Sequence, residues 1–158
     1  MTYPDPDFNN AIDELVAPLR INVADRHEDF RDATVMTRIS FSPRFRFFSS
    51  DQKRMLREWT GWMPTAELIA EMHVARAIDL HDRKDPLQAV EEYDQALEAA
   101  PEGPAVAEIL YRRGMAAFLG NKFDIELLKK DWQAVLKNHP GTRWALHASV
   151  IEDATKGS

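Results

Sequence analysis

The chain has 158 residues, of which 44% are hydrophobic and 29% charged, and it carries a formal net charge of −6 without any cysteine. This composition is typical of a soluble globular protein with one domain, or with a small repeat domain and an N-terminal extension. It excludes disulfides and thiolate metal sites, it offers no apolar run long enough for a membrane span, and its acidity disfavours broad affinity for nucleic acid.

Residues 1–64 are expected to form an N-terminal extension of mixed structure. Apolar side chains recur at helical spacing from about Asp7, which predicts a helix that Pro18 kinks or ends. Residues 22–34 are polar, and their structure is ambiguous from the sequence.

Two further elements are predicted between this polar stretch and the helical part of the chain. Residues 35–41 and 44–48 alternate between polar and apolar with period two, which predicts two short strands or an extended pair of segments. Ser49, with Gln52 three residues later, matches a capping box and predicts a helix to about Trp59.

The same region reverses the charge of the chain. Residues 35–64 hold six basic and two acidic side chains, whereas the segments on either side are acidic. Arginine alternating with phenylalanine can bind single-stranded nucleic acid, or it can dock its rings on helices while its cations meet an acidic surface. We favour docking. The candidate basic and aromatic patch consists of Arg38, Arg44, Phe45, Arg46, Phe47 and Arg54.

Residues 65–158 are expected to form a domain of antiparallel helix hairpins. Long stretches rich in alanine, leucine and glutamate are separated by turn signals at near-regular intervals. Short links place consecutive helices antiparallel, with their apolar stripes packed together. The five predicted helices run from about Thr65 to Asp82, Pro86 to before Pro101, Pro104 to Leu119, Phe123 to Asn138, and Thr142 to Ala154.

An internal sequence repeat supports repeated structural units within this domain. The nine residues from Tyr93 to Pro101 are similar in pattern to those from Trp132 to Pro140, which lie 39 positions later. In both copies an aromatic residue stands eight positions before a proline, with aliphatic residues between them. Such periodicity is typical of stacked helical repeats, which present a surface rather than a reaction centre.

These residues resemble the tetratricopeptide repeat (TPR) family, whose unit is an antiparallel helix pair with small residues at the helix contact. The proline spacing of 39 exceeds the usual 34 of the family, so about one extra helical turn must be accommodated, and residues 138–145 resemble the junction between the longer repeats of bacterial envelope-assembly scaffolds. The resemblance covers about two and a half units. Its first copy is Ala77, Leu80, Ala89, Val90, Tyr93, Ala96, Leu97 and Pro101, and its second is Gly114, Ala117, Phe123, Leu127, Trp132, Val135 and Pro140.

The resemblance implies a concave groove lined by the first helix of each pair, which binds a peptide or a partner helix. An alternative stays open, in which Val74, Ile78, Met115 and Phe118 are core residues against the N-terminal segment. The groove residues implied by position are Glu71, Val74, Ile78, His81, Glu108, Tyr111, Arg112, Met115 and Phe118.

We therefore expect a non-catalytic protein-interaction scaffold or adaptor with no cofactor. The five histidines show no paired ligand spacing, and no phosphate-binding loop or nucleophile elbow is present. The partner is expected to be another protein or peptide, and the absence of a signal-peptide pattern favours the cytoplasm. The alternatives are a nucleic-acid-associated protein that uses the arginine and phenylalanine stretch, and a self-associating structural subunit.

Overall fold

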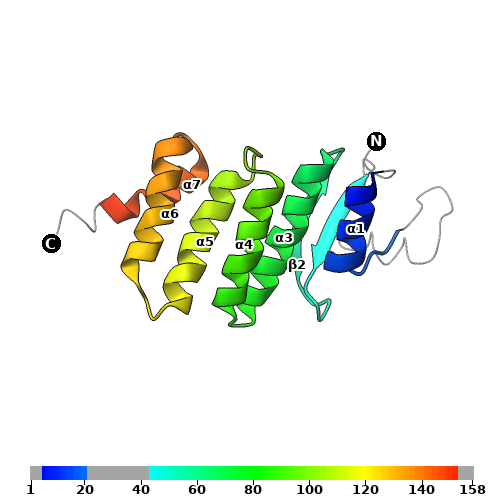
Figure 1. The fold of residues 1–158 in the computed structure, drawn as a ribbon, viewed down its shortest axis with the longest axis horizontal. Helices are drawn as coiled ribbons and strands as arrows, with labels where there is room; N and C mark the ends of the chain where they lie inside the picture. Colours follow the sequence, from blue (N-terminus) through cyan, green and yellow to red (C-terminus); the bar gives the residue numbers. More distant parts are fainter. Residues whose placement is uncertain (1–4, 21–42, 153–158) are drawn as a thin grey trace.

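The computed structural model describes residues 5–20 and 43–152. In these residues the chain is mainly helical, with one small antiparallel sheet. Figure 1 shows the helices as a row that follows the order of the chain. The elements are α1 (Pro6–Leu15), β1 (Arg44–Phe48), β2 (Met55–Thr60), α3 (Thr65–Asp82), α4 (Pro86–Ala99), α5 (Val106–Gly120), α6 (Ile125–Asn138) and α7 (Arg143–Ala148).

The helices predicted for the C-terminal part are confirmed, with differences at their ends. Helix α3 has the predicted bounds, and α4 begins at Pro86, where the side chain of Asp85 accepts a hydrogen bond from the backbone of Gln88. Helix α7 ends at Ala148 and the backbone is helical again at residues 150–152, whereas residues 153 and 154 of the predicted helix lie outside the described residues.

One core lies where α3, α4 and α5 meet, and it is rich in alanine. Tyr93 is only 1% exposed, and burial raises the pKa of its hydroxyl to about 12. Small side chains around this ring allow the three helices to approach closely. The buried members are Ala70, Val74, Ala77, Ala89, Tyr93, Ala96, Ala100, Ile109 and Ala116.

A second core lies between α5, α6 and α7, around Trp132. The indole stacks on Tyr111 with ring centroids 4.7 Å apart, and its Nε1 donates to the backbone carbonyl of the same tyrosine at 3.0 Å. Gly114 permits this approach, because a Cβ there would lie 3.0 Å from Cβ of Asp131 and 3.1 Å from the indole. Leu128, Trp132, Val135, Ala145, Ala148 and Ile151 are among the buried members.

An ion-pair clamp reinforces the row of helices. Arg113 of α5 binds both carboxylate oxygens of Asp131 in α6, at 2.6 and 2.8 Å, and reaches Asp94 of α4 at 2.6 Å. Its hydrogen bonds with Asp131 raise the pKa of Arg113 above its ordinary value, with a smaller contribution from Asp94. The fork geometry of a guanidinium suits this contact, which joins three helices through one side chain.

The third core joins the β-hairpin to α1 and α3. Phe45 of β1 stacks on Trp59 of β2 with centroids 5.1 Å apart, and Phe47 lies 5.4 Å from the same indole. These rings pack against a cluster that includes the buried Phe8 of α1 and Leu68 of α3. The predicted alternation of residues 44–48 is thus confirmed, with Phe45 and Phe47 on the inner face of the hairpin and Phe48 exposed.

The helix predicted from Ser49 to Trp59 is wrong. Ser49 instead closes the hairpin turn, since its Oγ accepts from the backbone N–H of Arg54 at 3.1 Å and donates to Asp51 at 2.5 Å. Gln52, the second residue of the expected capping box, has a φ of 60° in this turn. The partner of β1 is β2, whereas the strand predicted at 35–41 and the ambiguous segment 22–34 lie outside the described residues.

Helix α1 is anchored to the first turn of α3. Asp5 caps α1 by accepting from the backbone N–H of Asp7 at 3.0 Å, and it also accepts from Thr65 Oγ1 at 2.8 Å. These hydrogen bonds, that of Thr65 first, lower the pKa of Asp5 below its ordinary value. No helix in the part of the chain that the structure describes is long and apolar enough to cross a membrane.

Candidate functional site

The most distinctive charged contact of the molecule is made by Arg57. This residue stands on the inner face of β2, and its side chain is 15% exposed. It forms an ion pair with Glu71 of α3 and a second with Glu108 of α5, whose Oε1 lies 3.0 Å from Nη1. One guanidinium therefore bridges two helices that are separated in the chain by α4.

The ionisation of this cluster is coupled. Burial by itself raises the pKa of Glu108, but the charges and hydrogen bonds of Arg57 and Arg112 lower it below its ordinary value. Burial opposes the charge of Arg57 in the same way, and Glu71 and Glu108 outweigh it, so that the pKa of Arg57 is raised. The charged forms of Arg57 and Glu108 therefore stabilise each other.

The hairpin also follows α3 toward its C-terminal end. Arg54 forms an ion pair with Asp82, and its Nη2 lies 3.5 Å from Asp79. Hydrogen bonding to Asp82 is the main reason that the pKa of Arg54 is raised. Together with Arg57, this contact neutralises acidic side chains of α3, which is the arrangement that the charge pattern favoured.

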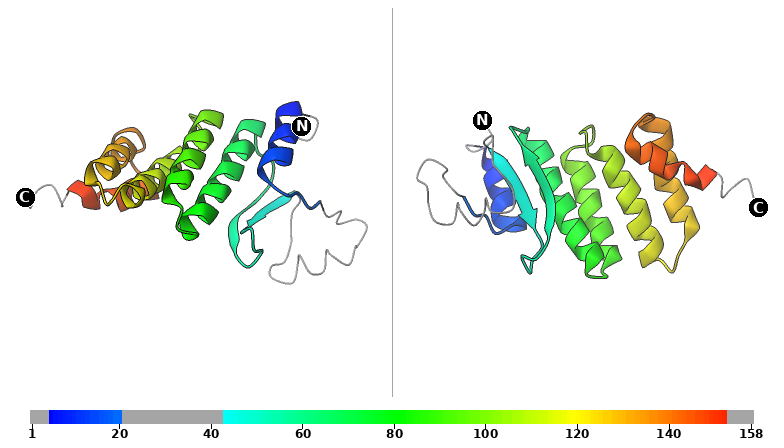
Figure 2. Two further views of the ribbon diagram at one scale, coloured as in Figure 1. Left: turned by 60° about the horizontal axis from the view of Figure 1, so that its bottom comes forward. Right: turned by 180° about the vertical axis from the view of Figure 1, so that it is seen from behind.

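Helix α7 covers the other end of the α5 face that carries Glu108. Tyr111 of α5 lies 5.3 Å from the ring of Trp144, and His147 lies 5.8 Å from Tyr111. Arg112 is connected to both ends, because its Nε donates to Glu108 at 2.7 Å while its Cζ lies 5.3 Å from the centroid of Trp144. Both views of Figure 2 place the hairpin and α7 on the same side of the helical row.

The groove residues implied by the TPR resemblance lie in three places: at the hairpin end, at the α7 end and in the core. Glu71 and Glu108 are covered by Arg57, and Val74 is 0% exposed within the core around Tyr93, which is formed by α3, α4 and α5 rather than by the N-terminal segment. Ile78 packs half-buried against the same core.

The remaining groove residues lie at the α7 end or at the end of α3. Tyr111, Met115 and Phe118 pack half-buried against the core around Trp132. His81 is half-buried in the last turn of α3.

The sequence arguments missed Arg57 at the hairpin end, and Arg143, Trp144 and His147 at the α7 end. A signal was present for α7, because Arg143 and Trp144 begin a predicted helix and His147 follows one turn later. We define the α5–α7 surface as Tyr111, Arg112, Met115, Arg143, Trp144 and His147.

The predicted basic and aromatic patch is split between two faces of the hairpin. Arg44 and Arg46 both bind Glu58, at 2.6 and 2.8 Å, whereas Phe45 and Phe47 face α3. These hydrogen bonds, that of Arg44 first, lower the pKa of Glu58. Arg38 lies outside the described residues.

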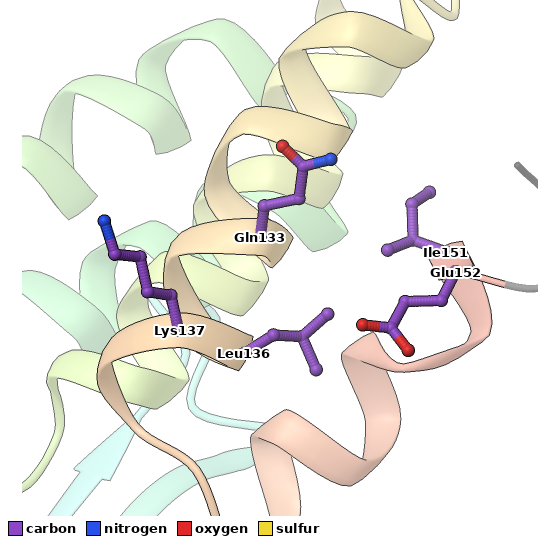
Figure 3. Close-up of a pocket in the computed structure, with 5 residues that line it drawn as sticks. All are labelled: Gln133, Leu136, Lys137, Ile151 and Glu152. Carbon is purple, nitrogen blue, oxygen red and sulfur yellow. The ribbon is translucent and has the colours of Figure 1, made fainter.

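A hollow of about 320 Å³ lies at the far end of the row, between α6 and the residues after α7. Leu136 and Ile151 contribute its apolar wall, and Gln133, Lys137 and Glu152 its polar rim (Figure 3). Within residues 5–20 and 43–152, no three histidine or acidic side chains are grouped so that they could hold a metal ion.

Comparison of the chain with family models, curated proteins and solved structures gave no match.

Proposed function

We propose that this protein is a non-catalytic adaptor in which α3 to α7 act as TPR-like repeats and bind a partner segment on the α5–α7 surface. Tyr93 and Trp132, which are 39 positions apart, support the repeat assignment. Each is buried on the second helix of a pair, and each belongs to a core that includes residues of the next helix, Ile109 and Ala116 of α5 for Tyr93 and Ala145 and Ala148 of α7 for Trp132.

The observation that carries the proposal is the composition of the α5–α7 surface. It combines Tyr111 and Met115, both half-buried, with the guanidinium of Arg112, which is 37% exposed. Large aromatic and arginine side chains dominate the binding energy of protein interfaces, because they bury area while keeping a polar edge. The hairpin covers the neighbouring part of α3 through Arg57, so the partner is directed toward α7.

Affinity capture of the full chain tests this proposal. We expect Tyr111→Ala and Met115→Ala each to weaken the binding of copurifying proteins by about tenfold. Leu87→Ala on α4 is the matched control, because this leucine is 51% exposed and lies outside the α5–α7 surface. Thermal melts of each variant separate lost binding from lost folding, and unchanged capture by both folded variants would show that the surface is wrongly placed.

The alternative of a self-associating subunit has one observation in its favour. Helix α7 exposes Leu146, and Val150 follows one turn later, with exposed fractions of 72% and 58%. Light scattering distinguishes the two proposals, since a mass that grows with protein concentration and is reduced by Leu146→Glu would favour self-association.

A further inference from the structure

Two arginines converge on one indole at the α7 end of the α5–α7 surface. The guanidinium carbon of Arg143 lies 4.7 Å from the ring centroid of Trp144, and that of Arg112 lies 5.3 Å from it. The two cations come from different helices, and Trp144 is held in place by its contact with Tyr111 at 5.3 Å. Both guanidinium groups are thus positioned by packing within the folded chain.

Both arginines have N–H donors available to bind a further acceptor. A guanidinium carries five N–H donors, and Arg112 uses its Nε to bind Glu108 at 2.7 Å. Arg143 is exposed and forms no ion pair with any residue that the structure describes. Stacking on an indole occupies the flat face of a guanidinium and leaves its N–H edges available for an acceptor.

The charge around the indole is opposite to that of the chain as a whole. The protein has a net charge of −6, whereas this part of the surface holds the two cations of Arg112 and Arg143. Glu108 is the only acidic side chain bound to either arginine in the described part of the chain, and it is shared with Arg57. An anion is therefore attracted to this place by the field of the arginines.

We propose that Arg112 and Arg143, whose guanidinium groups both lie against the ring of Trp144, bind a carboxylate side chain of an acidic peptide segment. This inference rests on the proposed adaptor function and specifies the chemistry of its partner. A carboxylate matches the planar donor edge of a guanidinium, and an apolar neighbour in the same peptide packs on Tyr111 and Met115. Because the arginines are held before binding, less side-chain entropy is lost when the carboxylate arrives.

A peptide carboxylate fits this surface better than a nucleic-acid phosphate. Nucleic acid brings a run of closely spaced charges, and the acidic chain repels such a polyanion over a long range. Glu71 and Glu108, each 8% exposed, already bind Arg57 along the path toward the hairpin, so this cation is not available to a second phosphate. A single carboxylate next to an apolar residue avoids this repulsion.

Fluorescence anisotropy with the full chain tests the inference. The ligand is a short, blocked, labelled peptide of alternating glutamate and leucine, and its reference is the same peptide with glutamine in place of glutamate. We expect the glutamate peptide to bind about tenfold more tightly, and Arg143→Gln and Arg112→Gln each to remove most of that preference. Lys53→Gln is the matched control, because it removes the same charge from a side chain that is 81% exposed in the hairpin turn.

Other outcomes overturn the inference in distinguishable ways. Equal affinity for the two peptides, or no binding of either, excludes carboxylate recognition. Stronger binding of a labelled oligothymidine than of the glutamate peptide would identify nucleic acid as the ligand. Capture of copurifying proteins that is weakened by Tyr111→Ala but not by Arg112→Gln or Arg143→Gln would support the adaptor proposal. The same result would exclude an acidic peptide as the partner.

Discussion

The hairpin and α6 attach to α5 in opposite ways. Helix α6 buries Trp132 against Tyr111, so that its attachment is an apolar contact with one indole hydrogen bond. The hairpin reaches α5 through Arg57 and Glu108, an ion pair of mostly buried groups. Apolar burial tolerates changes in pH, whereas a buried pair stabilises only while both partners are charged. The row of helices is therefore expected to be less sensitive to conditions than the cover that the hairpin provides.

The largest effect should come from the apolar attachment. We expect Trp132→Ala to reduce the free energy of unfolding by about 4 kcal/mol, because a large buried ring is replaced by a cavity. Urea unfolding followed by circular dichroism measures this loss. Trp132→Phe keeps a ring but loses the hydrogen bond to the Tyr111 carbonyl, and should cost about 1 to 2 kcal/mol. Equal losses in the two variants would assign the attachment to the hydrogen bond instead.

Removing the charged attachment should have a somewhat smaller effect. We expect Arg57→Gln to destabilise the protein by about 3 kcal/mol, because Glu71 loses its cation and Glu108 keeps only Arg112. The same urea experiment measures it, with Lys53→Gln at the hairpin turn as the control for a lost positive charge. A midpoint that does not move in Arg57→Gln would mean that the hairpin is held by its phenylalanines alone.

Acid should reveal the smallest difference between the two attachments. The folded state lowers the pKa of Glu108, so the unfolded state binds more protons between the two pKa values. This contribution of Glu108 to the free energy of unfolding is fully present above the pKa of Glu108 in the unfolded chain. It is lost as the pH falls through the pKa of Glu108 in the folded protein. Urea midpoints measured downward from neutral pH should therefore decline less steeply in Glu108→Gln than in the wild type. Glu98→Gln, at an exposed position of α4, should keep the wild-type slope.

The helices of residues 65–152 were predictable because their signals are local. Asp85 and Pro86 mark the start of α4, and Asp124 caps α6 by accepting from the backbone of Glu126. These signals depend only on neighbours within one turn of the chain. The bounds of α3 could be read from the sequence for the same reason.

The hairpin was not predictable in the same way. Residues 55–60 carry no turn signal that separates a strand from a helix, and the pair of Ser49 and Gln52 imitates a helix start. The strand is selected by distant contacts, since Trp59 stacks on Phe45 and Arg57 reaches Glu108. Such contacts override local propensity.

The candidate site was predictable in part. The resemblance to the TPR family pointed to Tyr111 and Arg112 of α5 as groove residues, which stays a prediction, and it could not show that Arg57 covers Glu71 and Glu108. Charge balance did indicate that the basic segment meets an acidic surface. The convergence of Arg112 and Arg143 on Trp144 depends on how α7 packs, which no spacing within α7 reveals.

The link between Arg57 and Glu108 also has a consequence for the order of assembly during synthesis. The two residues are 51 positions apart, so Arg57 leaves the ribosome well before its second carboxylate is made. Translation adds roughly 5 to 20 residues each second, which leaves seconds in which this guanidinium has only Glu71 available. The nascent hairpin therefore completes its attachment only after α5 has emerged and folded.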